Sequence, residues 1–243
     1  MTPASSGALY VVATPIGNLK DITQRALEIL SSVDLILAED TRQTAKLLSH
    51  YKIQTPSTSF HDYTAGKKQD SIIQKLKDGK NLALVSDSGT PLVSDPGFPL
   101  LRDAVEAGIT IIPIPGASAV LAAIVASGAP MERFVFEGFL PPKGSPRRER
   151  LAKIGEEEST IVLYESPYHL IKLLEDLSTI LGANRKIVIG RELTKIHEEF
   201  LRGTVAEMLE TFKNKKIQGE FVIIVPKKDK TERLEELESQ SEI

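Results

Sequence analysis

The feature of this sequence that most constrains its fold is a repeated alternation of short apolar runs with helix-length amphipathic segments. In the first half, strands are expected at residues 9–13, 34–40, 81–86 and 109–114, with amphipathic helices between them. Asp21 is positioned to cap the first helix. Such alternation predicts an α/β fold in which helices cover both faces of a mostly parallel sheet.

The pattern restarts near residue 130, and short links between the later strands predict a second sheet that mixes parallel and antiparallel pairing. We therefore expect two α/β domains, one over residues 1–128 and one over residues 129–228. A flexible acidic tail is expected over residues 229–243, where six acidic and two basic residues give a net charge of −4.

Composition excludes several classes of protein. Hydrophobic residues make up 41% of the chain, enough for sizeable cores, and cysteine is absent, so disulfides and thiolate metal sites cannot form. We expect a cytoplasmic protein without a signal peptide. The longest uncharged stretch, residues 109–130, is broken by Pro113, Pro115 and Gly116, so a strand, a turn and a helix are expected there in place of a membrane span.

Three strands end in unusual loops: ATPIGNLKD (residues 13–21), SDSGTPLVSDPG (residues 86–97) and PIPGASA (residues 113–119). Parallel strands present such loops at one edge of a sheet, where open α/β folds bind ligands. The sequence has neither the dinucleotide nor the P-loop glycine pattern, and it has no G-x-S-x-G elbow. It also has no histidine pair at metal spacing, so we expect no metal.

Residues 81–99 contain no lysine. The loops offer hydroxyls, carboxylates and bare backbone, which suits a zwitterionic, ribose-bearing ligand better than a polyphosphate. The alternative is that the glycines and prolines only shape a long crossover.

The motifs VVATPIGNLKDITQRALEIL, LAEDTRQTAKLL, LVSDSGTPLVSDPG and PIPGASAVLAA together resemble the ribosomal RNA small subunit methyltransferase I family. FVFEGFLPPKGSPRRERL, IVLYESPYHL and IGRELTKIHEEFLRGT continue the resemblance, which spans about residues 8–226. That family is a branch of the tetrapyrrole (corrin/porphyrin) methylases. Thr90 departs from the wider superfamily, because corrin methylases usually carry an aspartate there.

The resemblance implies S-adenosylmethionine as methyl donor, bound in the cleft between two α/β domains of a protein that is usually a homodimer. It implies 2′-O-methylation of a cytidine ribose in the decoding region of 16S ribosomal RNA, within the 30S subunit and away from membranes. The positions that it assigns to the donor, with Asp87 as an alternative to Thr90, are Pro15, Asp87, Ser88, Gly89, Thr90, Val93, Ser94, Ser118, Ala119, Tyr164 and Glu165.

A ribose hydroxyl is a weak acid, so a nearby carboxylate would assist its attack. Glu39 and Asp40, at a strand end, are the candidate bases, with Glu165 a further possibility; Asp40 could instead cap the following helix. Basic residues predict a clamp for the RNA backbone, and the scarcity of aromatics nearby favours phosphate and shape recognition over base stacking. The residues expected to bind RNA are Arg42, Lys143, Arg147, Arg148, Arg150, Arg191 and Lys195.

Two other functions fit parts of this pattern. A small-molecule methyltransferase acting on a corrin or porphyrin would share the fold, although the basic loop and AEDTR motif speak against it. A non-catalytic RNA-binding assembly factor could also keep the fold, although the intact hydroxyl-rich loops argue against loss of the donor site.

Overall fold

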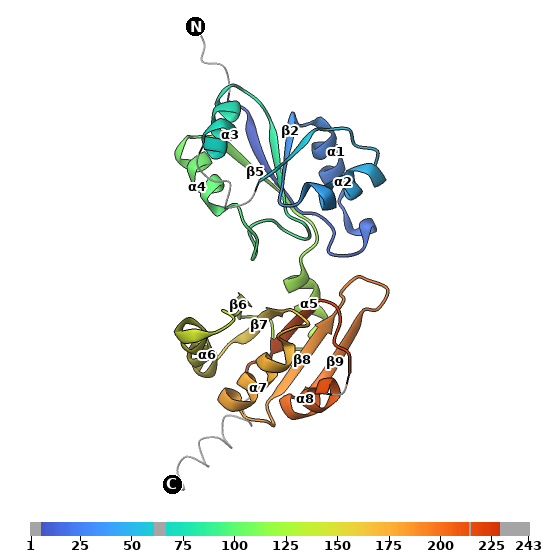
Figure 1. The fold of residues 1–243 in the computed structure, drawn as a ribbon, viewed down its shortest axis with the longest axis vertical. Helices are drawn as coiled ribbons and strands as arrows, with labels where there is room; N and C mark the ends of the chain where they lie inside the picture. Colours follow the sequence, from blue (N-terminus) through green and yellow to red (C-terminus); the bar gives the residue numbers. More distant parts are fainter. Residues whose placement is uncertain (1–5, 61–66, 214, 229–243) are drawn as a thin grey trace. The chain divides into compact units, whose positions relative to one another are not determined.

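The computed structural model describes residues 6–60, 67–213 and 215–228. The chain divides into two compact units, Met1–Ser118 and Ala119–Ile243, which are described separately below (Figure 1). The expected acidic tail lies outside the described residues.

The first unit is built on a five-stranded sheet in which every pairing is parallel. Its strand order is β3-β2-β4-β1-β5. The central strands are mostly buried because apolar residues point to both faces. The strands are β1 (Ala8–Val12), β2 (Leu35–Ala38), β3 (Ser57–Ser59), β4 (Leu82–Val85) and β5 (Thr110–Ile114).

Helices cover both faces of this sheet, as the alternation predicts (Figure 1). On one face, α1 (Gln24–Ser32) and α2 (Thr41–His50) bury residues such as Leu30 and Leu48. On the other, α3 (Lys67–Lys77) and α4 (Phe98–Glu106) pack against Leu9 and Leu84. The expected cap of α1 is wrong: the Thr23 side chain accepts from Ala26 N, while Asp21 ends the short 3-10 turn η1 (Leu19–Asp21).

The second unit contains a mixed sheet in the order β6-β7-β10-β8-β9. Among the residues that the structure describes, β6 and β7 pair in parallel and the three other pairings of this sheet are antiparallel. This confirms the expected mixed pairing of the second half. The strands are β6 (Phe134–Phe139), β7 (Thr160–Glu165), β8 (Lys186–Arg191), β9 (Glu199–Thr204) and β10 (Phe221–Val225).

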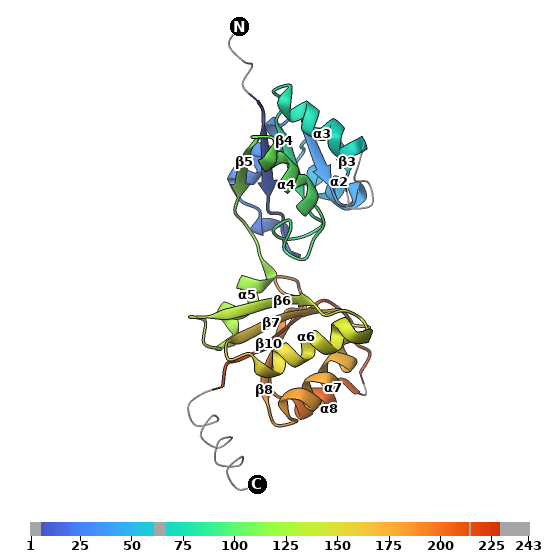
Figure 2. The same ribbon diagram turned by 90° about the vertical axis from the view of Figure 1, so that its left-hand side faces the viewer.

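Three helices, α6 (Gly144–Glu156), α7 (Leu170–Leu181) and α8 (Val205–Lys213), pack on one face of this sheet over a continuous apolar core. Helix α5 (Ala119–Ser127) packs on the opposite face, against β8 and β10 (Figure 2). Arg202 of β9 holds the end of α5, since its Nη2 donates to Ala126 O at 2.6 Å.

The two compact units divide between Ser118 and Ala119, before α5, whereas the sequence pattern places the boundary at residues 128/129. The apolar sequence of α5 could not reveal which sheet the helix covers. The uncharged stretch 109–130 forms β5 and α5. Within the described ranges, we find no helix with the length and apolar character needed to cross a membrane.

Arg147, one of the residues expected to bind RNA, is buried in the structure. Its residue surface is only 6% exposed, and its Nε and Nη2 donate to Asp176 Oδ2 at 2.9 and 2.7 Å. Its Nη1 donates to Pro141 O at 2.9 Å, so the guanidinium ties α6 to α7 and to the loop before α6. The guanidinium is therefore enclosed by protein groups and is not presented to an RNA phosphate.

We predict that Arg147→Met destabilises the protein by about 2 kcal/mol, because it leaves the largely buried Asp176 with Lys172 as its remaining partner. Arg148→Met, one residue further along the same helix at an exposed position, should change stability by less than about 0.5 kcal/mol. Urea denaturation followed by circular dichroism measures both. Equal stability of the two variants would show that the buried ion pair does not hold α6 to α7.

Candidate functional site

The loops that follow β1 and β4 are joined by backbone hydrogen bonds at the edge of the first sheet where its strands end, here called the carboxyl edge. Thr14 N donates to Gly89 O at 2.8 Å, and Gly89 N donates back to Thr14 O at 3.1 Å. The buried Thr14 also directs its hydroxyl at Ser86 O, 3.4 Å away. This isolated antiparallel bridge fixes two loops that are 75 residues apart in the chain.

The loop after β5 joins the same structure. Thr90 Oγ1 donates to Ala117 O at 3.1 Å. A Cβ atom on Gly116 would lie 2.9 Å from the Ala13 Cβ, so only glycine permits this approach. Gly89, at φ +81°, similarly allows the backbone to pass against Ile16. The three loops predicted to meet at one edge therefore form one connected structure within the first unit.

The donor positions expected in the first unit lie on these loops, with different degrees of exposure. Pro15 and Gly89 are buried within the loop structure. Thr90, Val93 and Ser118 are half-buried, whereas Asp87, Ser88 and Ser94 are exposed. Ala119 follows directly as the first residue of α5.

The long loop after β4 holds non-glycine residues in a conformation that favours glycine. Leu92 has φ +73° and Ser94 has φ +68°. Leu92 packs close to Gly97, because a Cβ there would lie 3.0 Å from Leu92 Cδ2. Such strain persists only where surrounding contacts impose it, and the packing of Leu92 against Gly97 is one such contact.

Two carboxylates bind the ends of β2 and β4 to one another. Asp87 N donates to Glu39 Oε2 at 3.3 Å, and Asp40 N donates to Asp87 Oδ1 at 3.0 Å. Glu39, expected as a candidate base, and Asp87, expected near the donor, thus lie together at the carboxyl edge and brace its loops.

Asp40, the other candidate base, is the N-cap of α2: its Oδ1 accepts from Arg42 N at 2.8 Å. Its carboxylate also pairs with the Arg42 guanidinium, with Oδ2 and Nη2 2.6 Å apart. The hydrogen bonds from Arg42 lower the pKa of Asp40 to about 2. Asp40 is therefore a weak base. The same ion pair also occupies the guanidinium of Arg42, which was expected to bind RNA.

Asp95 belongs to the same group of carboxylates, although it was not among the residues predicted from the sequence. Burial raises the pKa of its carboxyl to about 6; a hydrogen bond from Ser86 opposes the shift, and the charges of Glu39 and Asp87 add to it. The sequence signal that could have found it is its position in the long loop SDSGTPLVSDPG.

The donor positions expected in the second unit lie at the end of β7. Tyr164 is half-buried and makes edge-to-face contacts with Phe136 and Phe139, at centroid distances of 4.9 and 5.4 Å. Glu165 is buried, and its Oε1 accepts from Ser166 N at 2.7 Å. These contacts fix both side chains within the second sheet.

The remaining cations expected to bind RNA differ in what they already contact. Lys143 and Arg148 are exposed. The Arg150 side chain is 47% exposed and its Nε lies 3.1 Å from Glu137 Oε2. Arg191 pairs with Glu199 across β8 and β9, and Lys195 pairs with both Glu192 and Glu220. Lys143 and Arg148 therefore offer their charge most directly.

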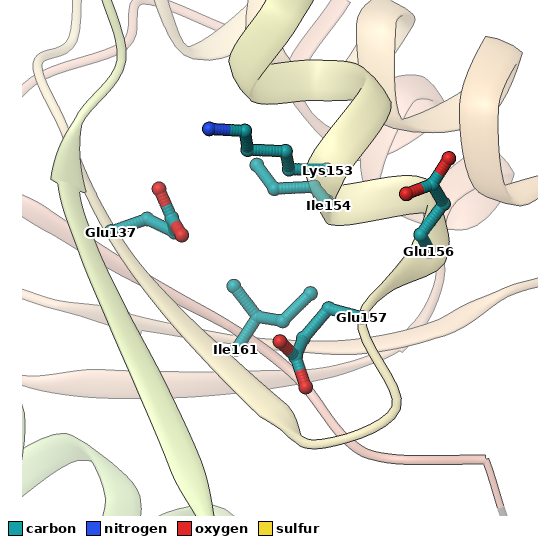
Figure 3. A pocket seen from close by; sticks show the side chains of 6 residues that line it. All are labelled: Glu137, Lys153, Ile154, Glu156, Glu157 and Ile161. Atoms are coloured by element: carbon teal, nitrogen blue, oxygen red, sulfur yellow. The ribbon is translucent and has the colours of Figure 1, made fainter.

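A pocket of about 350 Å³ opens between α6 and strands β6 and β7 (Figure 3). It is lined by Glu137, Lys153, Ile154, Glu156, Glu157 and Ile161. Three glutamates against one lysine make this lining unsuited to a phosphate backbone. In the part of the chain that the structure describes, no three or more His, Asp or Glu side chains gather as metal ligands.

Comparisons with known proteins agree on the family. The family model for tetrapyrrole (corrin/porphyrin) methylases matches residues 8–209. The ribosomal RNA small subunit methyltransferase I of Synechocystis sp. is 51% identical over 219 residues, covering 90% of this chain and 78% of the relative. The protein of that name from Haemophilus influenzae is 48% identical over 238 residues, covering 97% and 84%.

Solved structures show the same fold at low sequence identity. A diphthine synthase superposes with a TM-score of 0.71 at 14% identity, covering 94% of both chains. A cobalt precorrin-4 methyltransferase superposes with a TM-score of 0.65 at 19% identity, covering 90% of this chain and 94% of that one. The chain belongs to the tetrapyrrole methylase family of S-adenosylmethionine-dependent methyltransferases, in its ribosomal RNA small subunit methyltransferase I branch.

Proposed function

We propose that this protein transfers a methyl group from S-adenosylmethionine to the 2′-oxygen of a cytidine ribose in the decoding region of 16S ribosomal RNA, within the 30S subunit. The observation that carries the donor part is the union of the loops after β1, β4 and β5 through Thr14, Gly89 and Gly116. RNA as the acceptor is supported by the family branch and by the exposed cations Lys143 and Arg148.

The chemistry of the carboxyl edge fits this donor. Gly89 and Gly116 let the three loops pack closely, because a Cβ at these positions would press on Ile16 and Ala13, respectively. Ser88, Thr90 and Ser94 supply hydroxyl and amide groups, while Glu39 and Asp87 supply acceptors suited to ribose hydroxyls and an ammonium group. These residues would hold the donor together with Pro15, Val93 and Ser118, and Tyr164 and Glu165 are proposed to complete the set.

The donor supplies a methyl group already activated by its sulfonium. The protein has to orient the acceptor hydroxyl, exclude water and receive one proton. Asp40 is poorly suited to receive it, because its hydrogen bonds to Arg42 stabilise the charged form. We propose Asp95 as the proton acceptor, since it lies in the same loop as the donor positions and its carboxyl binds a proton more readily than Asp40.

The rival function is methylation of a small tetrapyrrole. Methyltransferases that act on tetrapyrroles share the fold at low sequence identity. The relatives that match most of this chain at much higher identity are named ribosomal RNA small subunit methyltransferase I. We predict that label from S-adenosylmethionine appears on ribose 2′-oxygens of unmethylated small ribosomal subunits and not on uroporphyrinogen. Nuclease digestion and mass spectrometry of the RNA measure this. Label on uroporphyrinogen alone would contradict the proposal.

We predict that Asp95→Asn lowers the single-turnover methylation rate by about 100-fold, because the amide cannot receive the proton. Asp40→Asn is the matched control: asparagine still caps α2, so the rate should change by less than about threefold. The wild-type rate should rise with pH through about 6, as the Asp95 carboxyl loses its proton, and this rise should be missing in Asp95→Asn.

Titration with S-adenosylhomocysteine controls for donor binding and should give similar affinities for wild type and both variants. A rate in Asp95→Asn equal to the wild type, with the same pH dependence, would remove Asp95 as proton acceptor and leave the proposed reaction standing.

A further inference from the structure

Three aromatic side chains, Phe136 and Phe139 of β6 and Tyr164 of β7, form a cluster that the sequence analysis did not foresee. Both phenylalanine rings meet Tyr164 edge to face. Phe136 is registered with Val162 and Phe139 with Tyr164, while a bulge at Glu137 shifts the pairing between them. Residues three apart in a regular strand point to opposite faces, but this extra residue brings Phe136 and Phe139 to the same side of the sheet.

Phe139 is the exposed member of this aromatic cluster. It keeps 56% of its surface exposed at the end of β6, which is the edge strand of the sheet. The helices α6, α7 and α8 pack on the face that carries Ile161 and Leu163, whereas Tyr164 alternates to the other face. There, α5 lies against β8 and β10. An exposed ring is thus held in place from beneath by Tyr164.

Positive charge directly follows this ring in the chain. Pro141 and Pro142 restrict the connection from Phe139 to α6, and the exposed Lys143 and Arg148 lie at the start of that helix. Phe139 and Lys143 are four residues apart in the chain. Proteins that bind single-stranded nucleic acid combine rings that stack on bases with cations that neutralise phosphates.

We propose that Phe139 is a stacking platform for a nucleobase of single-stranded RNA, with Lys143 and Arg148 binding the adjoining phosphates. This inference rests on the proposed RNA substrate and names how part of that substrate is recognised. It adds base stacking to the phosphate and shape recognition that the sequence favours at this loop. The acidic pocket between α6 and β6, by contrast, has the wrong charge for such a strand.

The chain contains no tryptophan, so Phe139→Trp introduces a single fluorescent reporter at the platform. A cytidine-containing RNA oligonucleotide of about 12 nucleotides should quench this tryptophan saturably. Val105→Trp is the control, at a position that is 60% exposed in the last turn of α4, and should not be quenched. If S-adenosylhomocysteine quenched this tryptophan and the RNA did not, the ring would belong to the donor site and the inference would be overturned.

A second measurement uses the affinity for small ribosomal subunits in a filter-binding assay. Phe139→Leu keeps an apolar side chain against Tyr164 but removes the stacking ring, so affinity should fall about tenfold, while Phe139→Trp should keep it. S-adenosylhomocysteine should bind all three proteins equally. Equal subunit affinity of wild type and Phe139→Leu would overturn the inference. Failure of the wild type to bind either subunits or RNA would instead contradict the proposed function itself.

Discussion

The proposed donor site depends on the reciprocal backbone hydrogen bonds between Thr14 and Gly89. A parallel sheet brings the ends of β1 and β4 to one edge, but it does not determine where the loops beyond those ends go. The bridge joins them, and Thr90 and Gly116 draw in the loop after β5. Because backbone atoms make these bonds, side chains such as Ser88 and Ser94 stay available for a ligand. The loop strain at Leu92 and Ser94 is consistent with a structure formed before any ligand binds.

Carboxylates at this edge have separate tasks because their surroundings differ. Asp40 is charged and fully occupied by the first turn of α2 and by Arg42. Glu39 and Asp87 accept amide hydrogens and join two loops. Asp95 is more enclosed and faces two like charges, which favours its protonated form. Residues of one chemical type thus divide into a helix cap, a loop brace and a proposed proton acceptor.

Much of the fold followed from sequence periodicity, because burial on both faces of a parallel strand leaves a continuous apolar run such as LALV of β4. The short polar strand β3 (STS) left no such signal, and the uniformly apolar α5 could not reveal its sheet. The three loops were recognisable from glycine, proline and hydroxyl residues. The roles of Arg147 and Asp95 were not, because they depend on Asp176, Ser86 and Glu39, which the fold brings near them from other elements. The bulge at Glu137, which aligns Phe139 with Tyr164, likewise has no local sequence marker.

Amide hydrogen exchange tests the central claim, that the three joined loops bind the methyl donor, most directly. Exchange would be followed by mass spectrometry with and without S-adenosylhomocysteine, on peptides covering residues 13–21, 86–97 and 113–119. We predict that binding slows exchange in all three peptides together, because one ligand contacts one connected structure. Binding that protects other segments and leaves these three unchanged would contradict it.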